Sequence, residues 1–218
     1  FIRTSHTRDA EKREPVWQSI KTGWRYIFKT PVLLSVMVLD MFAVLFGGAV
    51  SMLPAYADQV LHVGAEGLGV LRAAPALGAI TCMLILSLRP MKHVTAMRLF
   101  WAVAGFGVCI IGFGLSASFW LSMLFLIGTG ICDGISVVIR VILLQLLIPD
   151  HVKGRISAIS TMFIISSNEI GAFESGTAAR LLGLVPSVVF GGIMTLVIVA
   201  ATAVLSPKLR RTVVDTGE

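Results

Sequence analysis

Six apolar stretches, each about long enough to cross a bilayer as a helix, dominate this sequence of 218 residues. A helix rises about 1.5 Å per residue, so roughly 20 apolar residues span the hydrocarbon core. The stretches are residues 32–53, 68–88, 97–115, 119–148, 156–182 and 187–205. With 56% apolar and only 14% charged residues, the chain has too little polar surface for a soluble globule. The sequence therefore predicts an all-α membrane protein with six transmembrane helices.

The basic residues are distributed unevenly between the two sides of the expected membrane. The junctions after the first, third and fifth stretches contain no Lys or Arg, whereas the other junctions and the two chain ends hold 15 of the 18 basic residues. By the positive-inside rule, both termini are expected in the cytoplasm. These cations form a rim facing anionic lipid headgroups, so the positive net charge indicates membrane lipid as a partner and no nucleic acid.

Outside the six stretches the chain divides into three short segments. Residues 1–15 are polar and predict a cytoplasmic linker, and residues 206–218 predict a cytoplasmic tail. Within residues 16–30, Trp, Ile and Phe recur at helical spacing, with Lys21, Arg25 and Lys29 in steps of four along one edge. This pattern predicts an interfacial amphipathic helix, although a helix packed on another domain is the alternative. Since the chain opens without Met or a signal peptide, we expect it to be a piece of a longer polypeptide.

Residues 31–205 are expected to form a single six-helix transmembrane domain. The six stretches divide into two sets of three, which run in opposite directions through the membrane because three is odd. Each set begins with a helix that carries an Asp and ends at a Pro, from Asp40 to Pro54 and from Asp133 to Pro149. An inverted pair of three-helix repeats is a known architecture of secondary transporters.

Several motifs resemble the major facilitator superfamily, in particular the bacterial branch that contains the enterobactin exporter. LDMFAVLFGG at 39–48, LPAYA at 53–57 and GLGVLRAAPALGA at 67–79 are similar to its seventh and eighth helices. PDHVKGRIS at 149–157 resembles its loop between helices ten and eleven, and SNEIGAFESG at 167–176 resembles the helix that follows. The cytoplasmic loop motif comprises Pro149, Lys153, Gly154 and Arg155.

The resemblance implies the C-terminal half of a twelve-helix permease of the bacterial inner membrane, with the N-terminal six-helix half missing from this sequence. One departure concerns RPMKH at residues 89–93, where the family often carries a Gly/Asp/Arg loop motif. The basic residues are retained and the Asp is absent. A gate that depends on that Asp is therefore not expected in this half.

Charged residues inside the predicted helices are the strongest functional candidates. An ionised side chain at the bilayer centre costs at least about 2.5 to 3.5 kcal/mol, so each must face protein or water. Asp40 and Arg140 both lie about 12 to 14 Å from the cytoplasmic helix ends, at 1.5 Å per residue. We expect them to pair across the cavity, either as part of the transport machinery or only to fix helix packing.

A second set of polar and charged residues lies farther from the cytoplasmic side of the expected bilayer. Arg72 and Glu174 are predicted near the outer face within reach of each other, while Asp133, Asn168 and Glu169 are predicted near the midplane. The carboxylates that have no basic residue to pair with in this half must be protonated, face water or pair with the missing half. Proton coupling through Glu169 or Asp40 is the resulting hypothesis.

These patterns together predict half of a secondary active transporter. We expect it to move a small molecule by alternating access, with proton-coupled export as the favoured direction. No catalytic, cofactor or metal motif is present in the sequence, so no enzyme activity is predicted. Two alternatives stay open at this point, a helical membrane subunit that does not transport and an intramembrane hydrolase using Ser167 and Glu169.

Overall fold

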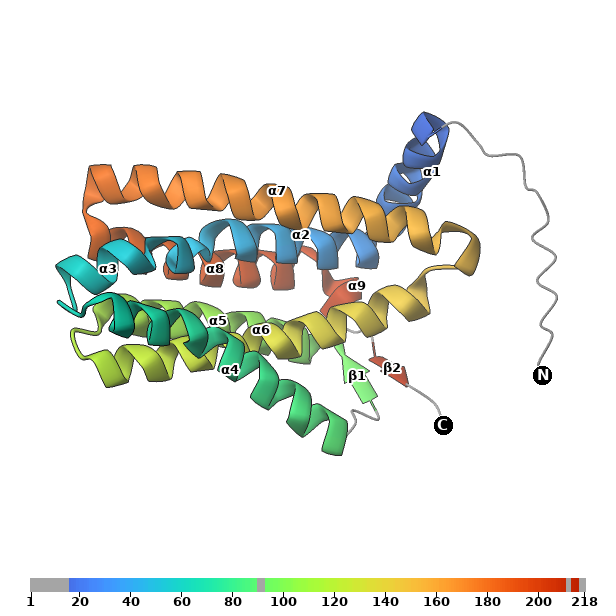
Figure 1. Ribbon diagram of the computed structural model, residues 1–218. Helices are drawn as coiled ribbons and strands as arrows, with labels where there is room; N and C mark the ends of the chain where they lie inside the picture. The colour runs from blue at the N-terminus through green and yellow to red at the C-terminus, as the bar shows by residue number, and fades with distance from the viewer. Residues whose placement is uncertain (1–15, 90–92, 211–212, 216–218) are drawn as a thin grey trace, which may run out of the picture.

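The computed structural model describes residues 16–89, 93–210 and 213–215, and the predicted linker 1–15 lies outside them. An antiparallel bundle of long helices occupies most of the described chain (Figure 1). Six stretches are long and apolar enough to span a membrane, which confirms the sequence prediction. The long helices are α2 (Pro31–Phe46), α4 (Ala65–Leu88), α5 (Ala96–Leu115), α6 (Phe119–Leu147), α7 (Asp150–Leu182) and α8 (Leu184–Leu205).

The first three spanning helices interleave with the last three. Helix α6 packs against both α4 and α5, α5 also packs against α8, and α2 packs against α7 and α8. Helices α4 and α7 lie on opposite sides of the bundle (Figure 1). Each three-helix set is thus stabilised mainly by contacts with the other set, as expected of two inverted units that form one domain.

The first span is interrupted, which corrects the prediction of one continuous helix over residues 32–53. Helix α2 ends at Phe46, a 3-10 turn η1 (Gly48–Met52) follows, and helix α3 (Leu53–Gln59) completes the span. A Cβ added at Gly48 would lie 2.5 Å from Ser175 Oγ and 3.0 Å from the carbonyl oxygen of Gly171. The chain therefore passes close to α7 at this point, and only a residue without a side chain fits there.

Small residues allow the helix backbones to approach one another. A Cβ added at Gly130 of α6 would overlap the backbone of Pro75 in α4, and one at Gly171 would lie 2.5 Å from the carbonyl oxygen of Leu45. Such close approaches increase dispersion contacts where lipid removes the hydrophobic driving force between helices. Gly183 forms the α7–α8 turn with φ +94°, a conformation that favours glycine.

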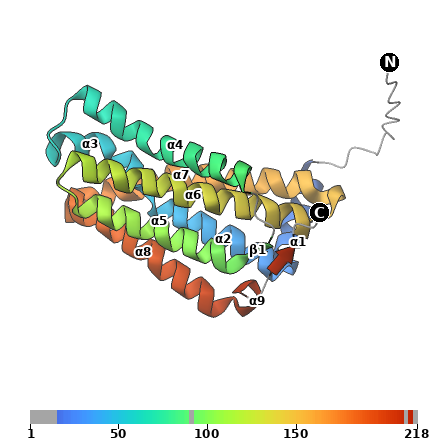
Figure 2. The same ribbon diagram turned by 90° about the horizontal axis from the view of Figure 1, so that it is seen from below.

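The two ends of the bundle differ in structure. Helix α1 (Val16–Lys29), helix α9 (Pro207–Arg210) and strands β1 (His93–Thr95) and β2 (Val213–Asp215) gather at one end, which we call the basic end (Figures 1 and 2). Strands β1 and β2 pair in antiparallel register, and Leu209 of α9 is fully buried. This strand pair was not predicted. It forms between two segments 120 residues apart in sequence and lies outside the six spans.

The opposite end is held by a buried tyrosine. Tyr56 of α3 is fully buried, and its Oη lies between 2.9 and 3.1 Å from the carbonyl oxygens of Phe113, Gly114 and Ser116. Phe113 and Gly114 belong to the last turn of α5, where helix geometry leaves carbonyls short of donors, and Ser116 directly follows the helix. Tyr56 therefore fixes to α5 the end of the broken first span that lies opposite the basic end.

Candidate functional site

A groove of about 860 Å³ lies along one side of the bundle. Its walls come from the end of α2, the broken segment η1, and the facing sides of α4, α6 and α7. Most of the wall is apolar or glycine, and its charged and amide side chains are Arg72, Asp133, Arg140 and Asn168. The groove therefore brings together four of the seven polar residues that the sequence singled out.

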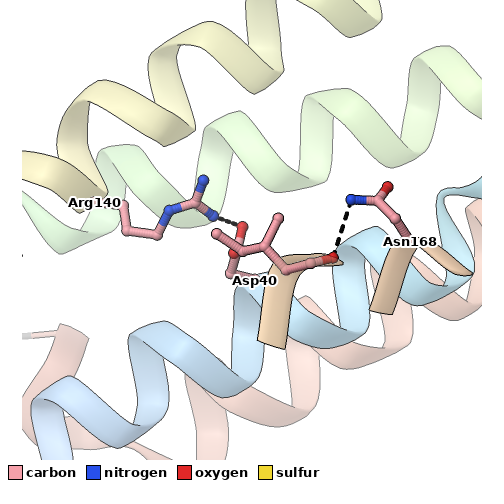
Figure 3. Close-up of polar contacts among 4 residues, drawn as sticks. Asp40, Arg140 and Asn168 are labelled. Atoms are coloured by element: carbon pink, nitrogen blue, oxygen red, sulfur yellow. Dashed lines mark hydrogen bonds and ion pairs between the residues drawn. The ribbon is translucent and has the colours of Figure 1, made fainter. Parts of the chain in front are cut away.

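Asp40 and Arg140 form an ion pair between α2 and α6, which confirms the expected pairing (Figure 3). The pair joins Nη1 of Arg140 to Oδ1 of Asp40, and the two side chains are only 9% and 11% exposed. It forms because α2 begins and α6 ends at the basic end of the bundle, which places Asp40 and Arg140 at similar depth. Each charge neutralises the other in a region where an unpaired one would be costly.

Asp133 lies two helical turns from Arg140 on the same side of α6. Asp133, Val137 and Arg140 follow the i, i+4, i+7 spacing of one helix face, and all three line the groove. A smaller pocket of about 30 Å³ is bordered by both Asp40 and Asp133. That volume is enough for about one water molecule, which needs polar partners such as these carboxylates. The two acids therefore border a common water-sized space.

Asn168 contributes an amide to the groove from α7. Its Nδ2 donates a hydrogen bond to the carbonyl oxygen of Ile164, 3.0 Å away and one turn earlier in the same helix (Figure 3). Ile164, Asn168 and Ala172 lie in steps of four, and each lines the groove. The face of α7 that borders the groove is thus defined by this stripe.

Glu169 and Glu174, also on α7, lie away from the groove lining. Glu169 is exposed and shares its side of the helix with the exposed apolar residues Met162, Ile165 and Phe173. The expected pair of Arg72 and Glu174 is wrong for the described residues, where neither side chain makes an ion pair. Arg72 projects from α4, on the opposite side of the bundle from α7, so similar depth along the helices did not bring them together.

The predicted cytoplasmic loop motif lies in a helix. Pro149 precedes the first turn of α7, which begins at Asp150, so Lys153, Gly154 and Arg155 are helical rather than in a loop. Lys153 and Arg155 both take part in interactions with other residues. Gly23 of α1 packs against Arg155 and Ile159, so this segment holds α1 to the bundle.

The sequence analysis missed the contribution of the broken first span. Gly47, Gly48, Val50 and Ser51 all line the groove. Helix breaks at membrane depth are tolerated where the backbone is buried in protein or lines a cavity. The available signal was the paired glycines ahead of Pro54, a pattern that favours interruption of a helix.

Comparison with known proteins identifies one matching family. A family model described as a transmembrane secretion effector matches residues 2–215, nearly the entire chain. A search among curated proteins found no match.

Proposed function

Because the chain belongs to the transmembrane secretion effector family of the major facilitator superfamily, we propose that it is half of a secondary active transporter exporting a small molecule. The family description and the six apolar helices support a multi-pass membrane transporter. In our proposal the protein lies in a bacterial inner membrane with both termini in the cytoplasm, and it works by proton-coupled alternating access. The cytoplasmic assignment rests on the sequence, in which the chain ends and the junctions on one side of the spans hold 15 of the 18 basic residues.

The observation that carries this proposal is the groove at the depth of the spanning helices. Arg72, Asp133 and Arg140 line it together with backbone of the broken first span. Charged side chains and irregular backbone inside a bilayer must face water or protein, and they commonly mark substrate and ion pathways. Its volume of about 860 Å³ also lies in the range of small-molecule sites.

A second membrane half would complete the cavity. Glu169 is exposed on a side of α7 that also exposes Met162, Ile165 and Phe173. A carboxylate at this depth is too costly to face lipid, so this side of α7 requires a protein or water-filled neighbour. We propose that the neighbour is the N-terminal six-helix half of the same polypeptide, and that the substrate binds between the halves.

Proton coupling is proposed for the two acids that border the smaller pocket. Asp40 and Asp133 border the same water-sized pocket, and Arg140 holds Asp40 in an ion pair. A proton reaching Asp40 through this pocket would remove the negative charge that Arg140 needs, so that protonation and opening of the α2–α6 contact become linked. Glu169 remains a coupling candidate on the exposed side of α7, where it would act at the join with the second half.

The hydrolase alternative receives little support from the geometry of α7. Ser167 is buried whereas Glu169 is exposed, because two residues along a helix differ by about 200° in direction. A nucleophile and its base must lie within hydrogen-bonding distance of one another. A helical subunit that does not transport would require no groove lined by charged side chains, so measured transport separates it from our proposal.

The test is transport by the full-length polypeptide in proteoliposomes. A panel of fluorescent organic cations and anions is offered while an internal pH dye reports proton flux under an imposed pH gradient. Uphill movement of at least one compound, accompanied by proton flux in the opposite direction, is the expected result. A folded protein that moves neither protons nor any compound of the panel would contradict the transporter proposal.

Matched amide substitutions then locate the coupling acid. Asp133→Asn, Asp40→Asn and Glu169→Gln each keep the size and hydrogen bonding of the side chain but cannot titrate. The variant of the coupling residue should lose uphill transport while retaining exchange of substrate down its gradient. If all three variants pump with the wild-type dependence on pH, coupling resides in the second half.

A further inference from the structure

Helix α1 lies across the basic end of the bundle rather than along it (Figure 1). One side of α1 is fixed to the protein: Ile27 is buried in a cluster with Leu33 and Ile156. The hydroxyl of Tyr26 donates a hydrogen bond to the carbonyl oxygen of Leu147, 3.1 Å away. The helix therefore has a defined orientation, and its remaining sides face outward.

The length of α7 indicates the depth of α1 in the membrane. Helix α7 has 33 residues, and counting about 20 residues back from Leu182 crosses the hydrocarbon and reaches Met162 and Phe163. Trp24 of α1 stacks on Phe163 with ring centroids 5.4 Å apart and an interplanar angle of 13°. Helix α1 is thus attached where α7 leaves the hydrocarbon, at the level of the lipid headgroups.

Aromatic rings cover the outward side of α1 that is nearest the hydrocarbon. Trp24 and Phe28 are 42% and 58% exposed, and they contact each other edge to face at 5.5 Å. Trp101, near the same end of the bundle, is also exposed. Exposed aromatic residues gathered at this level are typical of the membrane interface, where the rings contact the upper acyl chains.

Beside these rings α1 presents three cations that are not neutralised by protein. Lys21, Arg25 and Lys29 are all exposed, lie in steps of four, and make no ion pair within the described part of the chain. Lys153 and Arg155 on the adjoining α7, by contrast, interact with other residues. Three like charges on one edge repel one another unless an anion lies among them.

We propose that α1 and the neighbouring turn of α7 form a binding site for an anionic phospholipid. The phosphate lies among Lys21, Arg25 and Lys29, and an acyl chain lies across Trp24, Phe28 and Phe163. The charge of the site selects an anionic over a zwitterionic headgroup, with each basic residue near the surface contributing about fivefold in affinity. Bound lipid would hold α1 in place and, through Phe163, fix the end of α7 against the same leaflet.

Photocrosslinking in nanodiscs tests this site in the full-length polypeptide. Phosphatidylglycerol with a diazirine in its acyl chain is added at a few mole per cent to phosphatidylcholine discs, and crosslinked peptides are mapped by mass spectrometry. We expect labelling of the peptides containing Trp24, Phe28 or Phe163. Unlabelled phosphatidylglycerol should compete, and soluble glycerol 3-phosphate should not, because the site requires the acyl chain as well as the phosphate.

Two double variants of equal charge change serve as test and control. Lys21→Gln with Arg25→Gln should reduce this labelling on the order of 20-fold. Arg89→Gln with Arg180→Gln, which removes two exposed cations elsewhere, should leave it unchanged. Since all four side chains are exposed, thermal unfolding should confirm that both proteins fold. Equal labelling by a diazirine phosphatidylcholine, an equal loss in both variants, or unchanged labelling in the first would each overturn the proposal.

Discussion

Removing one charge of the Asp40–Arg140 ion pair by substitution should cost more stability than any other single substitution at the groove. Both side chains are about nine-tenths buried and are paired with each other. Removing one partner leaves the other as an uncompensated buried charge, a loss of about 3–5 kcal/mol in proteins generally. Because the pair borders a groove, we expect about 3 kcal/mol for Asp40→Asn and a similar loss for Arg140→Gln.

The double variant should recover much of that loss. With both charges removed, the two amides retain a hydrogen bond worth about 0.5–1.5 kcal/mol, and no buried charge remains unpaired. The loss in the double variant should therefore be smaller than the sum of the single losses by at least about 2 kcal/mol. Reversible unfolding in mixed micelles of dodecyl maltoside and sodium dodecyl sulfate measures each free energy of unfolding.

Asp133→Asn is the matched control for this cycle. It is the same substitution in the same groove, but Asp133 is exposed and makes no ion pair within the described residues. Its loss should be smaller than that of either single change, because it leaves no ion-pair partner as an unpaired buried charge. Strict additivity of the Asp40 and Arg140 losses would refute the reasoning, as would a control as damaging as either single change.

Three other predictions concern packing, topology and the strand pair. Gly130→Ala should lower the free energy of unfolding by about 1–3 kcal/mol, because the added Cβ would overlap the α4 backbone. Gly69→Ala, where the added Cβ meets open space, should be neutral or stabilising. Unfolding in the same micelles compares the two variants. In a cysteine-free background, a cysteine introduced at Gly64 should react with an impermeant maleimide added outside the cell, whereas a cysteine introduced at His93 should react only after permeabilisation. The reverse pattern would contradict the proposed topology. A stop codon at Val213 removes β2, so amide hydrogen exchange in β1 should accelerate; unchanged protection would show that the pairing contributes no stability there.

The sequence alone determined the features that depend on position along a helix. Six apolar runs of sufficient length specify six spans, because the bilayer has a fixed thickness. The pairing of Asp40 with Arg140 was also predictable, since the rise per residue converts sequence position into depth. Basic residues occur at every second junction and at both chain ends, and this asymmetry predicted the orientation of the spans through the positive-inside rule.

Similar depth was not sufficient for every pair. Arg72 and Glu174 were expected to meet on the same arithmetic, yet they project from helices on opposite sides of the bundle. Depth is one coordinate, and the lateral order of the helices is decided by which backbones can approach closely. The contacts of Gly130 with α4 and of Gly171 with α2 belong to that lateral order.

The tertiary structure alone decided which direction each side chain faces. Asn168 and Glu169 are neighbours in sequence, and one lines the groove while the other lies on the exposed side with Phe173. In a soluble helix, polar and apolar sides would have distinguished these directions. In a membrane, lipid and protein interior are equally apolar, so the sequence of α7 carries little signal about rotation. The number, depth and expected orientation of the spans therefore follow from the sequence, whereas the groove and its lining exist only once the helices have packed.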